Sequence, residues 1–260
     1  MIETRVLTTD DWAHWRELRL LALTEAGYAF GSQLADWQGD GDREDRWRAR
    51  LEVPGSYNVM VFDDGRAVGM AGGMPAGDGT VIELISMYVS PAGRGRGVGD
   101  LLMRAVEDWA RGVGAATLRL SVVEGNTNAR ALYERSGFRA TGELGDLMPD
   151  GVRREHVMDK SLRAVRLRVR LWARPGADEA LNAYENAVLD LLPDHGGRLL
   201  ERITGTGGPT EIQLIEFGDQ AGYDGFLADE RRLALAGQRD AAVARTEVDR
   251  VGREEYGTPA

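Results

Sequence analysis

The sequence contains no cysteine, one lysine and three histidines, and these absences exclude several kinds of chemistry. Without a thiol there is no disulfide, no thiolate-bound zinc or iron–sulfur cluster, and no cysteine nucleophile. His14, His156 and His195 are far apart in the chain, so a histidine-rich metal site within one subunit is not expected. The sequence therefore predicts a protein without a metal cofactor.

Long apolar runs and excess positive charge are also missing. No segment approaches the roughly 18 apolar residues that a membrane helix needs. The opening residues, MIETRVLTTDDW, lack the basic start and apolar stretch of a signal peptide. The net charge of −10 disfavours binding to the phosphate backbone of nucleic acids. We expect a cytoplasmic protein that binds neither membranes nor nucleic acid.

The pattern of apolar residues divides the 260 residues into two predicted domains, 1–162 and 163–260. In the first, a helix beginning after Asp10 and helices over 43–51, 98–111 and 128–136 are interspersed with strands. The strands are expected over 3–7, 57–62, 67–74, 80–89, 117–122, 138–143 and 153–159. The second domain has the order βαββαβ of a ferredoxin-like unit, with strands over 164–171, 198–204, 210–217 and 245–251 and helices over 178–192 and 221–235.

The most informative segment is 83–102, ELISMYVSPAGRGRGVGDLL, in which a strand runs into a glycine-rich turn and then a helix. Glycines allow backbone N–H groups to converge on an anion. The helix N-terminus adds unpaired N–H groups and the positive end of its dipole. Arg94 and Arg96 contribute charge and forked donors. This combination predicts a diphosphate site. It is neither a Walker A loop, which needs Gly-Lys-Ser/Thr, nor a dinucleotide turn placed after a first strand.

Residues 83–102 resemble motif A of the GCN5-related N-acetyltransferases (GNAT), and residues 120–138 resemble motif B of that superfamily. The motif B features are Asn126, Ala129, Ala131-Leu132-Tyr133 and Ser136-Gly137-Phe138. Ala29-Phe30-Gly31-Ser32 resembles a recurring stretch in one branch of small-molecule or peptide N-acetyltransferases. The resemblance covers residues 1–162 and indicates the superfamily and its cofactor, acetyl-CoA, but not the acceptor. It implies an α/β fold with a mixed, splayed central sheet flanked by helices.

The resemblance also implies how acetyl-CoA is held. The pantetheine arm enters a gap beside the strand that precedes the turn, where the backbone of Met87 and Val89 contacts it. Asn126 contacts the arm or the adjacent backbone. The diphosphate lies on the turn formed by Arg94, Gly95, Arg96, Gly97, Val98, Gly99 and Asp100.

The implied chemistry is direct attack of a neutral primary amine on the thioester. The resemblance makes Glu83 the general base, acting through water, and Tyr133 the donor to the departing sulfur. The N–H of Val89 is a candidate oxyanion donor. From the residues alone, Glu83 could instead pair with Arg119, and Tyr133 could pack beside Phe138. Ser121 stands where some relatives carry a carboxylate base, so the proton is lost to Glu83 or to bulk water. Glu124 is a further candidate base, and Asn128 is expected to cap a helix.

The acceptor is expected to be a small-molecule or peptide amine. Aromatic residues of the early helices either face it or pack the core: Tyr28, Phe30, Trp37 and Trp47, with Ser32 beside them. Asp146 and Asp150 of the late loop, together with the overall negative charge, mildly favour a cationic acceptor.

The second domain resembles, by order of elements alone, dimeric α+β-barrel domains. Strand 164–171 alternates apolar residues with arginines, so its apolar side must be covered by its own helices or by a second sheet. We expect a homodimer or a ligand-binding role. His195 is expected to be structural. Two other functions remain open for the whole chain: a CoA-binding sensor without turnover, and an enzyme with separate C-terminal chemistry.

Overall fold

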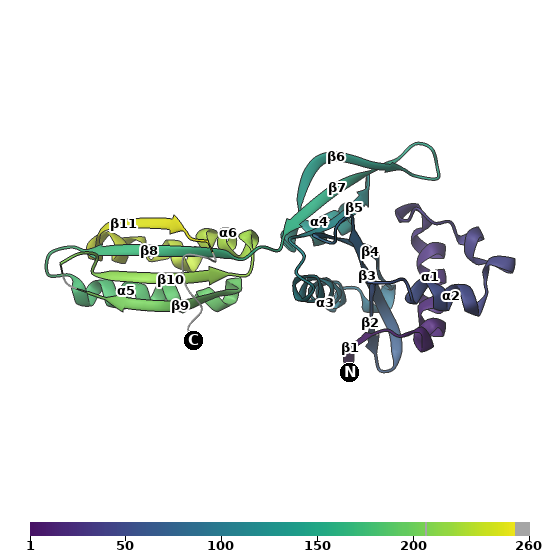
Figure 1. Cartoon of the computed structure of the whole chain (residues 1–260), viewed down its shortest axis with the longest axis horizontal. Coiled ribbons are helices and arrows are strands. Elements are labelled where there is room, and N and C mark those ends of the chain that lie inside the picture. Colours follow the sequence, from purple (N-terminus) through teal and green to yellow (C-terminus); the bar gives the residue numbers. More distant parts are fainter. Residues whose placement is uncertain (206, 253–260) are drawn as a thin grey trace. The chain divides into compact units, whose positions relative to one another are not determined.

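The computed structural model describes residues 1–205 and 207–252, and it divides into two compact units, Met1–Ser161 and Leu162–Ala260. Figure 1 shows the elements of both units. The N-terminal unit is built on a mixed sheet of seven strands, and the C-terminal unit on a second sheet of four. The expected mixed α/β fold is confirmed.

In the N-terminal sheet the strand order is β1-β2-β3-β4-β5-β7-β6. Every neighbouring pair is antiparallel except β4 and β5, which are parallel. The strands are β1 (Ile2–Val6), β2 (Tyr57–Asp63), β3 (Arg66–Ala76), β4 (Val81–Val89), β5 (Thr117–Val123), β6 (Arg139–Leu147) and β7 (Arg154–Ser161). The helices are α1 (Trp12–Ala26), α2 (Glu44–Leu51), α3 (Val98–Gly112) and α4 (Thr127–Arg135).

Helices cover both faces of this sheet, with α1 and α2 on one side and α3 on the other (Figure 1). Trp15 of α1 and Trp47 of α2 belong to the same buried cluster as Met70 of β3. A Cβ on the preceding residue, Gly69, would lie 2.6 Å from Val98 of α3. Since successive side chains of a strand point to opposite faces, glycine at 69 lets α3 approach the sheet closely.

A β-bulge interrupts β4 at the centre of the sheet. The register with β3 passes from Met70 opposite Tyr88 to Gly72 opposite Ile85, so β4 carries one extra residue there. Ser86 within the bulge has a φ of +56°, which a residue with a side chain seldom adopts. Such a bulge bends the strand.

Beyond the bulge β4 and β5 part from each other. Their parallel pairing extends only from Val81 opposite Thr117 to Glu83 opposite Arg119. The remaining residues of β4 therefore face an open gap, and the splay expected from the resemblance is observed.

Two predicted helix caps, Asp10 and Asn128, are wrong. Helix α1 begins at Trp12 after a short 3-10 turn, Thr9–Asp11, and Thr8 donates its backbone N–H to Asp11 at 2.8 Å. Asp10, the expected cap, pairs with Arg48 instead. At α4 the side chain of Asn126, not of Asn128, accepts the N–H of Ala129 at 3.3 Å. Equivalent polar residues near a helix start make such neighbours hard to distinguish from sequence.

Five further short segments of the described residues are 3-10 turns. They are η2 (Gly27–Ala29), η3 (Leu34–Trp37), η4 (Gly39–Gly41), η5 (Pro91–Gly93) and, in the C-terminal unit, η6 (Leu192–His195).

The C-terminal unit has the predicted βαββαβ order, with its last helical segment divided into three. Its antiparallel sheet has the order β11-β8-β10-β9. The elements are β8 (Val165–Ala173), α5 (Asp178–Leu189), β9 (Gly197–Thr204), β10 (Glu211–Phe217), α6 (Gln220–Ala228), α7 (Glu230–Ala234), α8 (Ala236–Ala242) and β11 (Val243–Arg250). Residues 253–260 of the predicted second domain lie outside the described residues.

The apolar side of β8 is covered by the unit's own helices. Val165, Leu167 and Leu171 form one buried cluster with Leu181 of α5 and Phe226 of α6. The other side of the sheet carries ion pairs, such as those that join Arg166 and Arg198 to Glu216. A second sheet is therefore not needed to cover the apolar side, and the homodimer stays a prediction.

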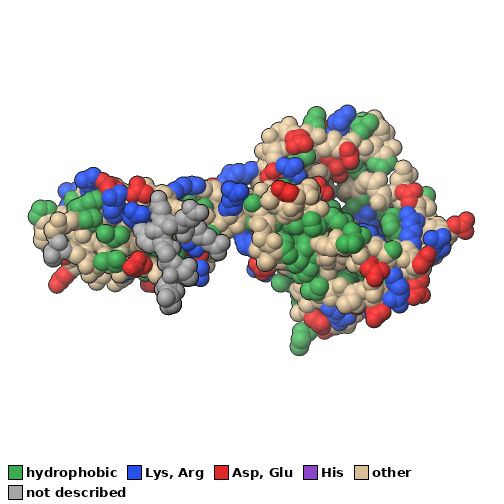
Figure 2. All heavy atoms as spheres, in the orientation of Figure 1, with side chains coloured by type: hydrophobic (Ala, Val, Ile, Leu, Met, Phe, Trp, Pro, Cys, Tyr) green, Lys and Arg blue, Asp and Glu red, His purple; other side chains and the backbone are tan. Residues whose placement is uncertain are grey.

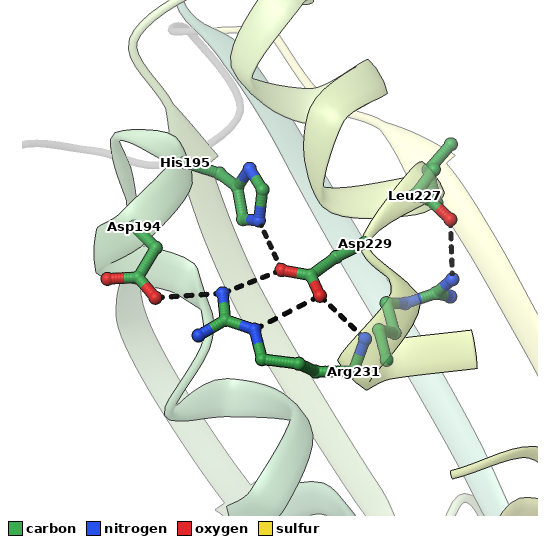
Figure 3. A network of polar contacts seen from close by, with 6 residues as sticks. Asp194, His195, Leu227, Asp229 and Arg231 are labelled. Carbon is green, nitrogen blue, oxygen red and sulfur yellow. Dashed lines mark hydrogen bonds and ion pairs between the residues drawn. The ribbon is translucent and has the colours of Figure 1, made fainter. Parts of the chain in front are cut away.

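The predicted helix 221–235 is wrong as a single element, because it is interrupted at Asp229. Asp229 is extended, with φ −61° and ψ 121°, and its carboxylate accepts the N–H of Arg231 at the start of α7. The same carboxylate meets His195 Nε2 at 2.7 Å, and Arg231 bridges it to Asp194 (Figure 3). Arg231, and then His195, hold the pKa of Asp229 well below its usual range. These contacts tie η6 to the helical segment, which agrees with a structural role for His195.

In the described residues no helix combines the length and the apolar character needed to cross a membrane. Over that same part of the chain, no cluster of three or more histidine, aspartate or glutamate side chains is arranged to hold a metal ion.

Candidate active site

Two cavities of the N-terminal unit meet at the bulged strand. The turn cavity, about 680 Å³, runs along the end of β4, the glycine-rich turn and the start of α4. The helix cavity, about 460 Å³, lies between α1, α2, β4, β5 and β7. Ala29, Phe30, Met87 and Tyr133 line both. Figure 2 shows this unit hollowed between the β6–β7 hairpin and the α1–α2 region.

The structure gathers nearly all of the predicted acetyl-CoA residues around the turn cavity. Its lining includes Met87, Val89, Arg94, Gly95, Gly97, Val98, Gly99, Asp100 and Asn126. Arg96 is the exception, because its guanidinium pairs with Asp63 at the end of β2 and does not line the cavity. Sequence reasoning could not separate the two arginines, since each follows the same strand within a few residues.

The backbone of the turn has the conformation that a diphosphate cradle requires. Gly95 and Gly97 have φ values of +70° and +74°, and Gly97 is the N-cap of α3. Positive φ at alternate residues turns successive N–H groups toward one side, where the helix dipole adds to the positive field. Arg94 is ion-paired with Glu25 at 2.9 Å beside this turn, and Asp100 with Arg135 at 3.2 Å.

The edge of β4 presents Val89 to the gap. The N–H of Ser90 donates to the carbonyl of Val68 on β3 at 2.9 Å. In an antiparallel ladder the neighbouring residue turns its N–H and C=O to the opposite side. Val89, opposite Gly69, therefore directs its N–H away from β3 and toward the gap between β4 and β5.

Tyr133 stands at the junction of the two cavities. Its side chain is 7% exposed and lies beside Phe138, with ring centroids 6.0 Å apart. Burial raises the pKa of its hydroxyl to about 12. The ring of Tyr133 therefore packs beside Phe138 while the residue also lines both cavities, and its role as a donor to the sulfur stays a prediction.

The carboxylates lie in the helix cavity. Glu83 lines it from β4, and Glu155 lines it from β7 beside Ser121. Arg119, the alternative partner of Glu83, makes a bidentate pair with Asp159 at 2.8 and 2.9 Å. Burial, and then the charge of Asp146, raise the pKa of Glu155. Glu124 lines neither cavity.

The comparisons with known proteins agree with this geometry. Residues 13–138 match the acetyltransferase (GNAT) family. An uncharacterized N-acetyltransferase of Bacillus subtilis, YhfO, is 31% identical over 113 residues, which cover 42% of this chain and 74% of YhfO. The chain belongs to the GNAT acetyltransferase family.

The GNAT chain has other relatives that differ more in length or sequence. The probable N-acetyltransferase family 8 member 5 of mouse is 31% identical over half of this chain and 58% of its own length. The chain spans about half the length of several curated relatives that it matches. Among solved structures, yncA of Salmonella typhimurium, determined with its cofactor acetyl-CoA, covers 63% of this chain and 95% of its own, with 22% identity and a TM-score of 0.53. That likeness shows the fold.

Sequence reasoning missed three charged residues of the GNAT unit that line the helix cavity, namely Arg19, Arg50 and Glu155. Each lies outside the two recognised motifs. Arg19 occupies the buried side of α1, where a 3.6-residue pattern would predict an apolar residue. That break in the pattern was the available signal. Glu155 carried no comparable signal, since a charged residue on a strand is ordinarily solvent-facing.

Proposed function

We propose that this protein transfers the acetyl group of acetyl-CoA to a primary amine of a small molecule or peptide in a ternary complex. The observation that carries the proposal is the meeting of two cavities at Met87 and Tyr133. One ends at a turn suited to a diphosphate, and the other contains carboxylates. A thioester placed at the junction would be within reach of an amine in the helix cavity.

The proposed reaction needs no covalent enzyme intermediate. The amine attacks the thioester carbon, and the N–H of Val89 stabilises the charge that develops on the carbonyl oxygen. Collapse of the tetrahedral intermediate breaks the carbon–sulfur bond, leaves the amide and releases CoA. The proton lost by the amine passes through water to Glu83 on β4, and the departing sulfur receives a hydrogen bond from Tyr133.

The state of Tyr133 defines its part in this reaction. A phenol with a pKa of about 12 is protonated throughout the physiological range. A thiolate with a pKa near that of cysteine, about 8.5, is too weak a base to remove that proton completely. Tyr133 therefore acts by donating a hydrogen bond to the sulfur as negative charge accumulates there.

Release of free thiol is the direct test of turnover. The full chain, incubated with acetyl-CoA and a panel of primary amines, should produce CoA thiol in step with acetylated amine. Binding of acetyl-CoA without thiol release for any amine would favour the alternative of a CoA-binding sensor.

The C-terminal unit is proposed to serve assembly or ligand binding. The paired charges on its open sheet face are the surface that a second copy would have to meet. Light scattering on the full chain should give twice the monomer mass, and a monomeric mass would remove the homodimer.

Replacing the proposed base is expected to slow the reaction strongly. Glu83→Gln should lower kcat/KM near neutral pH by about 100-fold, the usual contribution of a general base. The acetyl-CoA affinity should not change, because Glu83 does not line the turn cavity. Glu155→Gln is the matched control in the same cavity, with a smaller expected loss. If the larger loss instead follows Glu155→Gln, the base is Glu155.

The raised pKa of Glu155 also predicts a pH-dependent stability. The pKa of Glu155 is higher in the folded state than in the unfolded state. Its contribution to the free energy of unfolding is therefore fully present below the unfolded pKa and is lost as pH rises through the folded pKa. Glu155→Gln should therefore raise Tm slightly near neutral pH and leave it unchanged below about pH 4. Thermal unfolding across that range checks this, and equal shifts at every pH would contradict it.

A further inference from the structure

Two arginines of the helix cavity lack any negative partner in residues 1–205 and 207–252. Arg19 on α1 is 8% exposed, and its Nη1 is buried with no hydrogen-bond acceptor. Arg50 on α2 donates only to neutral oxygens, those of Asn58 at 3.3 Å and Ser86 at 3.4 Å. Arg119, in the wall of the same cavity, is fully paired with Asp159.

The surroundings of the two arginines disfavour the charged form of their side chains. Burial, followed by the proximity of Arg50, lowers the pKa of Arg19 to about 10, and burial also lowers that of Arg50. Buried charges are ordinarily paired, because an unpaired one loses its hydration without compensation. Within the described residues, these two adjacent cations are thus left without an anion.

A neighbouring neutral donor also lacks a hydrogen-bond acceptor. The indole Nε1 of Trp15 is buried without an acceptor, and Trp15 lines the same cavity. The guanidinium of Arg50 lies 5.3 Å from the centre of the Trp15 ring, and that of Arg19 lies 4.5 Å from the centre of Phe30. Aromatic rings hold the arginines in place without neutralising them. The missing group is therefore an acceptor with negative charge, for which a carboxylate has the matching forked geometry.

The acidic side chains of the cavity come from other elements than the two arginines. Glu83, Asp146 and Glu155 line it from β4, β6 and β7, whereas the two arginines come from α1 and α2. None of these acids contributes to the pKa shifts of Arg19 or Arg50. One side of the cavity thus carries two unpaired cations and the other carries three carboxylates with the paired Arg119, which suits a ligand that has both a negative and a positive group.

We propose that the acetyl acceptor is a primary amine that also carries a carboxylate, as a free amino acid does, with the carboxylate bound by Arg19 and Arg50 and the amine held on the side of Glu83. This proposal rests on the proposed function and narrows its acceptor class. It replaces the weakly favoured cationic acceptor, whose binding next to two unpaired arginines would be unfavourable.

Matched pairs of acceptors test the proposal. The full chain is assayed for thiol release with amino acids, including ω-amino acids, and with the corresponding carboxamides. For the best acceptor, kcat/KM should be about 10- to 100-fold higher for the acid than for its amide, the effect of one or two charge-assisted hydrogen bonds. The amide's amine is the less basic and is more readily neutral, so chemical reactivity alone would favour the amide.

Variants test whether the two arginines cause the preference for the acid over its amide. Arg50→Gln and Arg19→Gln should each remove most of the preference, because KM for the acid should rise by a larger factor than KM for the amide. Arg48→Gln is the control, because Arg48 lies on the same helix, pairs with Glu44 and Asp10, and does not line the cavity. Acids and amides used equally well by the wild type would overturn the proposal and leave the acetyltransferase intact.

A binding measurement separates this inference from the proposed activity. In the presence of CoA, the best amino acid should raise the Tm of the wild type, but not of Arg50→Gln, while its amide should have little effect. Arg19→Gln and Arg50→Gln should not lower the Tm of the free protein, since each removes an uncompensated charge. If no amine is acetylated, the proposed function fails. If, in addition, no carboxylate stabilises the wild type in an Arg50-dependent way, the anion site fails as well.

Discussion

Gly97→Val is expected to weaken acetyl-CoA binding by at least about 100-fold. Gly97 has a φ of +74° and no atom within 4 Å of a Cβ built on it, so the obstacle is the backbone and the ligand rather than packing. A β-branched residue disfavours this left-handed conformation by roughly 1–2 kcal/mol. The N–H groups that follow would then turn away from the diphosphate. Isothermal calorimetry with acetyl-CoA gives the affinity.

A second glycine provides the control for strain alone. Gly114, just beyond α3, has a φ of +82°, an equally open surrounding and no part in either cavity. Gly114→Val should cost similar stability and leave the acetyl-CoA affinity unchanged. Intact affinity in Gly97→Val would show that the turn does not hold the diphosphate, and the acetyltransferase proposal would lose its main support.

The turn could be predicted from sequence because its function depends on the backbone. Glycine at 95 and 97 reports the positive φ values directly, and a helix after the turn follows from the apolar pattern of α3. The bulge at Ser86 had no local signal of its own, since no glycine marks it. The resemblance predicted the splay between β4 and β5, which the short parallel pairing of these strands confirms, and the bulge itself was found in the register between β3 and β4.

The two wrong helix caps arise because similar polar residues lie close together at each helix start. Asp10 and Asp11, like Asn126 and Asn128, are chemically equivalent candidates one or two positions apart, and only the path of the preceding chain selects between them. The break at Asp229 depends on tertiary contacts, because its carboxylate is engaged by His195 from η6 as well as by Arg231. A helical period cannot reveal such a contact.

The helix cavity was the least predictable part of the candidate site because its residues come from separate elements. Arg19, Arg50 and Glu155 are brought together only when α1, α2 and β7 pack on the splayed sheet. The two arginines matter because no residue in 1–205 or 207–252 supplies a negative charge to pair with them. A sequence shows which charges exist but not which remain unpaired after folding.

Tyr133→Phe should lower kcat by roughly ten-fold or more, with little change in the KM for acetyl-CoA. The hydrogen bond from the hydroxyl to the sulfur becomes strong only as negative charge develops on the sulfur. Loss of the hydroxyl therefore destabilises the transition state more than the ground state. A hydrogen bond to a charged group contributes about 1.5–3 kcal/mol, which corresponds to the expected decrease. Single-turnover measurements isolate the chemical step from product release.

The structure also provides a way to distinguish this role from packing. If Tyr133 served only the core, phenylalanine would preserve both its contact with Phe138 and the rate of acetyl transfer. Tyr28→Phe is the matched control, because Tyr28 lines the turn cavity but not the helix cavity, and its kcat should not change. The Tm of Tyr133→Phe should remain close to that of the wild type, since no described residue bonds its hydroxyl. Unchanged single-turnover rates would remove Tyr133 from the reaction and leave the sulfur to be protonated by solvent.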